Sequence, residues 1–200
     1  MWGCKSLMTS QQEQIKLTEI IAPSFYDLHR DVVAERHTYY KLDGGRGAAK
    51  SSFVGTEIPL GMMRDAQGGK LTNAVAFRRY KENLHDSVFE QLLWAINKLG
   101  VAHLWKETVS PLRLTYIPTG QVILFRGADK VKKAKSIKVS KGYIKYLWFE
   151  ELDEFENPEK IRSVQQSVVR GGEQFTVFYS YNPPKSPVSY THLTLPTILR

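Results

Sequence analysis

The sequence has little cysteine, no long apolar run and no internal repeat. Cys4 is the single cysteine in 200 residues, so no disulfide can form within the chain, which excludes a small scaffold held together by disulfides. No apolar run approaches the roughly 18 residues of a membrane-spanning helix. The N-terminus also lacks the basic and then apolar layout of a signal peptide. We therefore expect a soluble, cytoplasmic protein that has no membrane partner.

The composition is that of a globular domain with an excess of positive charge. Hydrophobic residues make up 42% of the chain, and 28 lysines and arginines against 20 aspartates and glutamates leave a net charge of +8. This balance suits a polyanion such as nucleic acid. Residues 126–145 hold eight basic side chains and one acid, whereas residues 150–160 hold six acids and one base. Solvated faces are the alternative interpretation of both clusters.

Segments with a helical spacing of apolar residues alternate with β-branched and aromatic segments. This alternation indicates an α/β domain with a largely parallel sheet, and a hairpin around Pro118-Thr119-Gly120 forms an insertion or an edge. Pro59 and Gly61 weaken the second half of the second expected helix. The expected helices span residues 24–36, 50–63, 84–99 and 158–170. The expected strands span residues 38–42, 71–77, 112–117, 121–125, 143–149 and 174–181.

Residues 44–51 (GGRGAAKS) nearly fit G-x-x-x-x-G-K-[ST], the phosphate-binding loop between a strand and a helix. Glycines let main-chain N–H groups curl around phosphates, and the helix points its positive end at them. Lys50 would reach the β- and γ-phosphates, and the Ser51 hydroxyl would hold Mg²⁺. Ala49 replaces the second fixed glycine, which we expect to be tolerated only if its φ is negative. A glycine-rich turn that caps a helix is the alternative.

The apolar strand 146–151 (YLWFEE) ends in two carboxylates. It resembles a Walker B strand, in which the first acid binds Mg²⁺ and the second polarises the water that attacks the γ-phosphate. Glu150 stands where an aspartate is usual, and Glu151 takes the second position. An exposed strand end that leads into an acidic loop is the alternative.

A third motif, 179–184 (YSYNPP), places Asn182 directly after an expected strand. A polar group at such a strand end lies next to the γ-phosphate, so it can detect hydrolysis and transmit the resulting change to other parts of the protein. A strand that simply stops at prolines is the alternative. The sequence contains no N-K-x-D motif, which disfavours a GTPase.

In their order and spacing, three segments resemble the large subunit of tailed-phage terminases, the DNA-packaging motors. They are Gly44–Ser52, 148–155 (WFEELDEF) and 181–184 (YNPP), and the segments 85–100 and 125–129 (FRGAD) are similar to the same family. The resemblance covers residues 20–186 and is more specific as an ordered set than any single motif. It implies a P-loop ATPase fold of the ASCE or RecA-like type, with a mostly parallel sheet flanked by helices.

The resemblance also implies a role for each matched residue. Glu151 matches the catalytic acid, and Arg46 matches an arginine finger that acts in cis, with a solvated loop residue as the alternative. Ser51 and Glu150 match the metal-binding pair, and Asn182 matches the coupling motif that links hydrolysis to movement. The expected ATP-binding residues are Gly44, Gly45, Arg46, Gly47, Ala48, Ala49, Lys50, Ser51 and Ser52.

The same resemblance implies ATP and Mg²⁺ as cofactors. The implied partners are double-stranded DNA, the portal protein, the terminase small subunit and further copies of the chain in a ring, in the host bacterial cytoplasm. The basic stretch 126–145 would face DNA or acidic neighbours in the ring, with solvated lysines as the alternative. The rival functions are another P-loop nucleic-acid motor, such as a helicase, and a non-catalytic basic nucleic-acid-binding module.

The expected ATPase domain occupies residues 24–187, is incomplete at its C-terminal end and comes after a loose arm at residues 1–23. Terminase large subunits continue into an RNase H-like nuclease domain. This sequence has no carboxylate cluster besides the one at the Walker B strand, so we expect no nuclease activity. Residues 188–200 (VSYTHLTLPTILR) do not resemble the segment after the coupling motif in that family, and we expect a non-native tail there.

Overall fold

The computed structural model describes residues 15–128, 137–155 and 158–183, in which the chain forms a seven-stranded sheet. The strands are β1 (Tyr39–Asp43), β2 (Thr72–Arg78), β3 (Trp105–Val109), β4 (Leu112–Tyr116), β5 (Gln121–Gly127), β6 (Tyr143–Glu150) and β7 (Thr176–Tyr181). The α-helices are α1 (Tyr26–Val33), α2 (Lys50–Gln67), α3 (Glu90–Lys98) and α5 (Pro158–Val168). Short helical turns are η1 (Leu17–Glu19), η2 (Pro23–Phe25), η3 (Lys81–Leu84), η4 (His85–Phe89), η5 (Ala102–Leu104) and η6 (Leu152–Glu154).

The strand order β1-β7-β6-β2-β5-β4-β3 brings the three sequence motifs to one edge of the sheet. The strands from β1 to β5 in this order are parallel, and β4 and β3 continue the sheet in antiparallel fashion. Asp43 pairs with Tyr181, and Glu150 pairs with Ser180. The carboxyl ends of β1, β7 and β6 therefore lie side by side, which is where open α/β sheets bind ligands.

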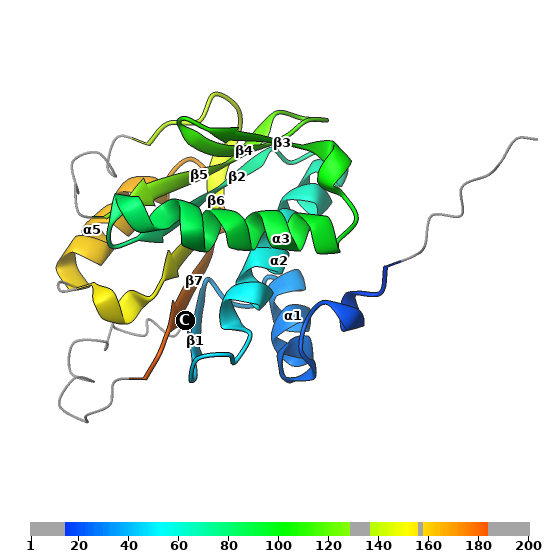
Figure 1. Cartoon of the computed structure of the whole chain (residues 1–200). Coiled ribbons are helices and arrows are strands. Elements are labelled where there is room, and N and C mark those ends of the chain that lie inside the picture. The colour runs from blue at the N-terminus through cyan, green and yellow to red at the C-terminus, as the bar shows by residue number, and fades with distance from the viewer. Residues whose placement is uncertain (1–14, 129–136, 156–157, 184–200) are drawn as a thin grey trace, which may run out of the picture.

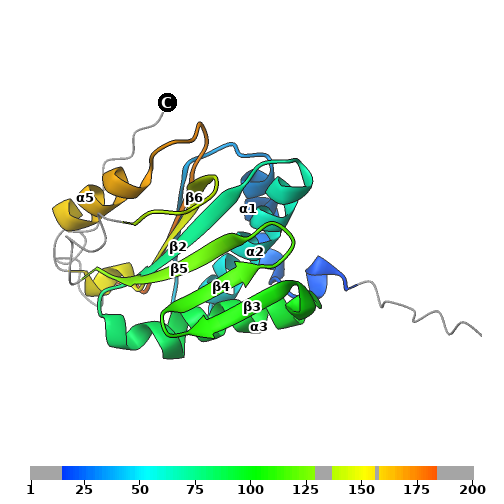
Figure 2. The same ribbon diagram turned by 90° about the horizontal axis from the view of Figure 1, so that it is seen from above.

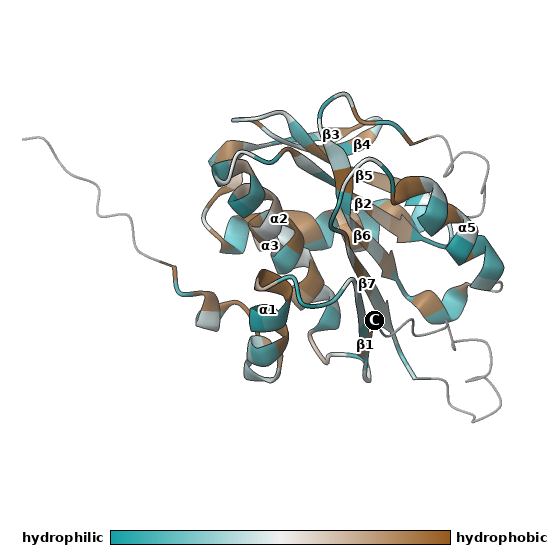
Figure 3. Ribbon diagram, turned by 180° about the vertical axis from the view of Figure 1, so that it is seen from behind, coloured by the Kyte–Doolittle hydropathy of each residue, from teal (hydrophilic) through white to brown (hydrophobic). Residues whose placement is uncertain are grey.

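Helices cover both faces of the sheet. The helices α1, α2 and α3 lie on one face, and α5 lies on the other (Figures 1 and 2). Ile58 and Trp148 belong to the core on the first face, and Val164 and Leu147 belong to the core on the second. Figure 3 shows hydrophobic residues concentrated in the central strands between these layers. Burial on both faces explains why β6 is almost continuously apolar.

The helix α2 continues through Pro59 to Gln67 and is therefore longer than expected. A proline inside a helix costs about 3 kcal/mol, because it removes a hydrogen bond and crowds the preceding turn. Val54, Ile58 and Met62 are fully buried along the same helix. Burying each such side chain contributes about 1.5–3 kcal/mol, so packing outweighs the cost of the proline.

The expected hairpin is present as β4 and β5, and Gly120 in its turn has a φ of 78°. Because β5 also pairs with β2, the hairpin belongs to the main sheet and is not an insertion. The strand β3 is not among the expected strands, since only Trp105 of its residues is buried and its apolar pattern is weak. The segment expected to be helical from residue 84 begins as η3 and η4 and becomes α-helical at Glu90.

Lys145 corrects the expectation that the basic stretch 126–145 faces a partner. Its side chain is 1% exposed, and its ammonium lies 2.8 Å from Oδ1 of Asp65 and 2.6 Å from Oε1 of Glu35. A buried cation requires such carboxylate partners. Lys145 therefore stabilises the domain interior, between the end of α2 and the start of β6.

The N-terminal segment contributes to the domain before α1. Ile21, within the arm expected at residues 1–23, is 5% exposed and belongs to the core beneath α1 and α2. None of the helices in the described part of the chain combines the length and apolarity that crossing a bilayer requires. Several expectations concern residues outside the described ranges, namely Lys130, Lys132, Lys133, Lys135 and the tail at residues 188–200.

Candidate functional site

The connection between β1 and α2 folds as a phosphate-binding loop. Gly47 has a φ of 80° and Ala49 a φ of 56°, and α2 begins at Lys50. The expectation that alanine is tolerated at position 49 only with a negative φ is wrong: the loop keeps the left-handed conformation although this residue carries a Cβ, at a cost of about 1–2 kcal/mol. The first main-chain N–H groups of α2 have no acceptor within the helix, which makes this helix end suitable for an anion.

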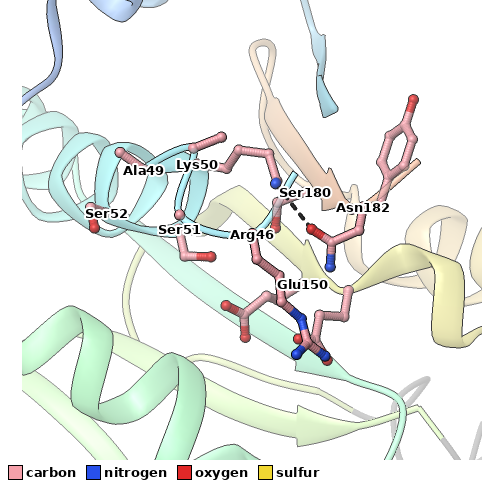
Figure 4. Close-up of a pocket in the computed structure, with 12 residues that line it drawn as sticks. Arg46, Ala49, Lys50, Ser51, Ser52, Glu150, Ser180 and Asn182 are labelled. Carbon is pink, nitrogen blue, oxygen red and sulfur yellow. Dashed lines mark hydrogen bonds between the residues drawn. The ribbon is translucent and has the colours of Figure 1, made fainter. Parts of the chain in front are cut away.

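Lys50 folds back over the loop and is 9% exposed. Its ammonium donates to the main-chain oxygens of Gly44 and Gly45, the latter at 3.0 Å, and to Oδ1 of Asn182 at 3.3 Å. Figure 4 shows this last contact between the loop and the segment after β7. All these acceptors are neutral, so the contacts leave the positive charge of Lys50 uncompensated.

Glu150 lies next to Ser51 and is 7% exposed. Its carboxylate accepts a hydrogen bond from the Ser51 hydroxyl, and Nη1 of Arg78 lies 3.3 Å from its Oε2. Burial raises the pKa of Glu150 above its ordinary value, whereas the Ser51 hydrogen bond and the Arg78 charge oppose that rise. The Glu150 carboxylate and the Ser51 hydroxyl line the same pocket as the phosphate loop, so together they offer oxygen ligands for a metal ion.

These two ligands suit Mg²⁺, which proteins usually bind together with substrate phosphates and not through protein ligands alone. Mg²⁺ in phosphate sites takes one or two carboxylates and completes its shell with phosphate oxygens and water. Within the described ranges, no three histidine, cysteine, aspartate or glutamate side chains gather as a metal centre. Ser51 and Glu150 are therefore the residues that would hold a magnesium ion together with a bound nucleotide.

The expected site residues surround one pocket of about 350 Å³, a size suited to a small-molecule ligand. Figure 4 shows side chains from the loop, from β6 and from the end of β7 around the same space. The lining residues are Arg46, Gly47, Ala48, Ala49, Lys50, Ser51, Ser52, Glu150, Glu151, Ser180, Tyr181 and Asn182. Gly44 and Gly45 are not in the lining, but their carbonyls hold Lys50. Lys50 and Glu151 thus face the same cavity.

Comparison with known sequences identifies the family. The profile of the phage terminase large subunit matches residues 36–194, most of the chain. The chain belongs to this family. It is 44% identical over 184 residues to the terminase large subunit of Bacillus phage SPP1, a match that covers 90% of this chain and 42% of that protein. This terminase chain therefore spans less than half the length of the curated relative.

Solved structures of packaging proteins share the fold of this terminase chain. The HK97 bacteriophage large terminase gives a TM-score of 0.61 at 15% identity, over 80% of this chain and 33% of that one. The Thermus phage P74-26 large terminase ATPase domain gives 0.53 at 12% identity, over 85% of this chain and 72% of that one. The bacteriophage Phi-29 packaging motor assembly gives 0.55 at 15% identity, over 84% and 50%. At these identities the likeness establishes the fold, the expected P-loop ATPase architecture.

Arg78 belongs to the terminase site, although sequence reasoning misses it. It lies at the end of β2, is 6% exposed, and its guanidinium lies 2.5 Å from Glu151, 3.3 Å from Glu150 and 3.3 Å from Glu154. Its Nε is buried without a hydrogen-bond partner in the described structure. The strand that carries Arg78 is expected, but its position beside β6 follows from the strand order, which no local pattern indicates.

Glu151 occupies a strained position at the end of β6. Its φ is 50°, a left-handed conformation that costs about 1–3 kcal/mol outside glycine and that often marks functional sites. Its ion pair with Arg78 turns the carboxylate toward β2. Ser180 and Tyr181, which are also absent from the expected site residues, line the pocket. The Ser180 hydroxyl accepts a hydrogen bond from Nε1 of Trp148 at 2.9 Å. The acidic run after residue 150 is therefore partly engaged in the site and is not simply a solvated face.

Proposed function

We propose that this chain binds ATP with Mg²⁺ and hydrolyses it, as the ATPase part of a motor that moves double-stranded DNA into a prohead. The observation that supports this most strongly is the shared pocket, in which Lys50, Ser51, Glu150 and Glu151 converge from two elements. Membership of the terminase large subunit family supports the same activity.

In this proposal the loop and Lys50 bind the triphosphate. Main-chain N–H groups of residues 44–52 donate to its oxygens. The ammonium of Lys50 exchanges the carbonyls of Gly44 and Gly45 for the β- and γ-phosphate oxygens. The exchange is favourable because a phosphate oxygen carries a negative charge that a carbonyl oxygen lacks.

The other side chains of the pocket bind the metal ion, activate water and respond to hydrolysis. Ser51 and Glu150 would hold Mg²⁺, which would neutralise charge on the phosphates. Glu151 accepts the proton of the attacking water as general base, for which its carboxylate turns from Arg78 toward the pocket. Arg46 donates to the γ-phosphate as an arginine finger in cis. Asn182 transmits the outcome of hydrolysis, because it contacts Lys50 directly.

The partners in this proposal are those of a whole packaging motor. They are double-stranded DNA, a portal protein, a terminase small subunit and further copies of the chain in a ring, in the host bacterial cytoplasm. The chain corresponds to 42% of the SPP1 protein, so these partners are proposed for the protein as a whole. We propose no nuclease activity for the residues of this chain.

The substitution Lys50→Ala tests whether the pocket binds ATP. We expect the affinity for ATP with Mg²⁺ to fall at least about tenfold, since a charged hydrogen bond contributes about 1.5–3 kcal/mol, and hydrolysis to disappear. Calorimetric titration and phosphate release measure the two effects. Lys41→Ala, which removes an exposed lysine of β1, is the control and leaves both unchanged. Equal ATP affinity in the two variants would contradict the proposal.

A further inference from the structure

One face of the β3-β4-β5 part of the sheet carries a cluster of positive charge. The opposite face of these strands packs Trp105, Leu114 and Ile123 into the core beneath α2 and α3. Figure 2 shows that no described helix covers the face that carries the charge. Strand pairing places seven side chains of alternate positions there, which we call the basic sheet face. They are Lys106, Thr108, Arg113, Thr115, Val122, Leu124 and Arg126. Leu124 is buried in the core that contains Ile137, and Val122 packs against it.

None of the described side chains on the basic sheet face is a carboxylate that could balance its charge. Lys106 and Arg113 are exposed, Arg126 is half-buried, and none of the three makes an ion pair with a described residue. Burial and the neighbouring Arg113 guanidinium lower the pKa of Arg126. Like charges placed together destabilise a fold unless an anion relieves their repulsion. The cluster therefore favours an anionic ligand.

The two threonines of the face carry hydrogen-bond donors of the kind that contact phosphate. Thr108 lies opposite Arg113, and Thr115 lies opposite Lys106. Hydroxyl, guanidinium and ammonium groups make most of the contacts between proteins and the DNA backbone. Lys141 extends the charge toward the β4–β5 turn, since its Nζ lies 4.0 Å from the position that a Cβ on Gly120 would take.

We propose that the basic sheet face binds the phosphate backbone of double-stranded DNA. This inference rests on the proposed function, for which it assigns the surface that contacts the DNA. A second copy of the chain is the less favoured occupant, because protein interfaces have an apolar centre depleted of charge. The apolar side chains of this face, Val122 and Leu124, pack into the protein core, and its exposed side chains are the charged Lys106 and Arg113. Phosphate contacts of this kind are indifferent to base sequence, as a packaging motor requires.

The basic sheet face also lies next to the nucleotide pocket. Arg126 pairs with Phe77 across β5 and β2, and the next residue of β5, Gly127, pairs with Arg78. Arg78 in turn contacts Glu151. One strand therefore separates the proposed DNA contact from the proposed catalytic base, which offers a short route between DNA binding and hydrolysis.

The double variant Lys106→Gln/Arg113→Gln tests the proposal in the full 200-residue chain. Binding of a short fluorescein-labelled DNA duplex of mixed sequence is measured by anisotropy over a series of salt concentrations. Each lost phosphate contact lowers the salt slope of log K by about 0.9, so we expect the slope of the double variant to fall by about 2. The matched control, Lys41→Gln/Lys98→Gln, removes the same charge from β1 and α3 and keeps the wild-type slope.

Three outcomes overturn the inference. They are a wild-type chain that does not bind the duplex, equal salt slopes in the two double variants, and a loss of self-association in sedimentation without a change in slope, which would assign the face to a second copy. Titration with ATP and Mg²⁺ on the same preparations separates this inference from the proposed function. If the wild-type chain binds ATP and the salt slopes stay equal, only the assignment of the DNA surface is contradicted. If the wild-type chain does not bind ATP, the proposed function itself is contradicted.

Discussion

Ala49 holds a left-handed backbone conformation at the point where the phosphate loop enters α2. Replacement by glycine removes the contact between Cβ and the following carbonyl while the loop keeps its shape. We expect Ala49→Gly to raise the free energy of unfolding by about 1 kcal/mol, seen as a higher urea midpoint with an unchanged m-value.

Ala48→Gly is the matched control for this prediction, because Ala48 is not among the residues with positive φ. There the glycine adds only conformational freedom to the unfolded chain, and we expect a small loss of stability of up to about 1 kcal/mol. A loss of stability in Ala49→Gly as large as that in Ala48→Gly would contradict the strain at Ala49.

Arg78 sets the ionisation of the acids at the end of β6. Its charge counteracts the effect of burial on Glu150, so Arg78→Met raises the pKa of that carboxyl further above its ordinary value. Because Mg²⁺ binds the ionised carboxylate, we expect the acid limb of the ATPase pH profile to move to higher pH. Arg79→Met removes the neighbouring charge and serves as the control. An identical shift in both variants would speak against the ion pair.

At the scale of elements, α1 and α2 are joined by His29 and Glu57. Nδ1 of His29 lies 2.6 Å from Oε1 of Glu57, whose side chain is 2% exposed. Burial raises the pKa of Glu57, and the contact with His29 opposes that rise. The folded protein therefore holds this proton more tightly than the unfolded chain, so stability falls as the pH rises from the unfolded pKa, about 4.3, through the folded one.

Glu57→Gln removes this dependence. We expect the free energy of unfolding of the variant, relative to wild type, to grow with pH across that window, measured by urea unfolding at a series of pH values. His29→Asn removes the group that lowers the pKa of Glu57 and should extend the window upward. A difference between Glu57→Gln and wild type that does not change with pH would contradict the assignment.

Most elements follow from local patterns, because burial imposes periodicity on the sequence. The apolar run of β6 and the stripe of α5 at Ile161, Val164 and Val168 predict both elements. The second half of α2 does not follow from its local pattern, because Pro59 predicts that the helix ends there. Burial against the sheet keeps the helix intact beyond that residue. The strand β3 lacks periodicity because it lies at the edge of the sheet with most of its residues exposed.

At the scale of the whole molecule, the site arises from the strand order. The motifs at Lys50, Glu150 and Asn182 are far apart in the sequence, and a parallel sheet brings the ends of their strands to one edge. Sequence reasoning recovers these residues because each belongs to a motif. Arg78 has no motif of its own, and its role depends on the placement of β2 beside β6.

The whole fold also determines which charged side chains are buried and which reach the surface. Lys145 belongs to the basic stretch by sequence, yet it is buried against Asp65, whereas Lys106 and Arg113 lie outside that stretch and face the surface beside Arg126. Counting charges along the chain therefore predicts an anionic partner but does not locate the surface that would bind it.

The most direct test of the account is a single turnover of pre-bound ATP in Glu151→Gln. Glutamine keeps the shape of the side chain but cannot accept the proton of the attacking water, and a general base contributes about 10²–10⁴-fold to a rate. We predict that the variant binds ATP with Mg²⁺ as tightly as wild type and releases phosphate at least about 100-fold more slowly. Release at the wild-type rate would contradict the account.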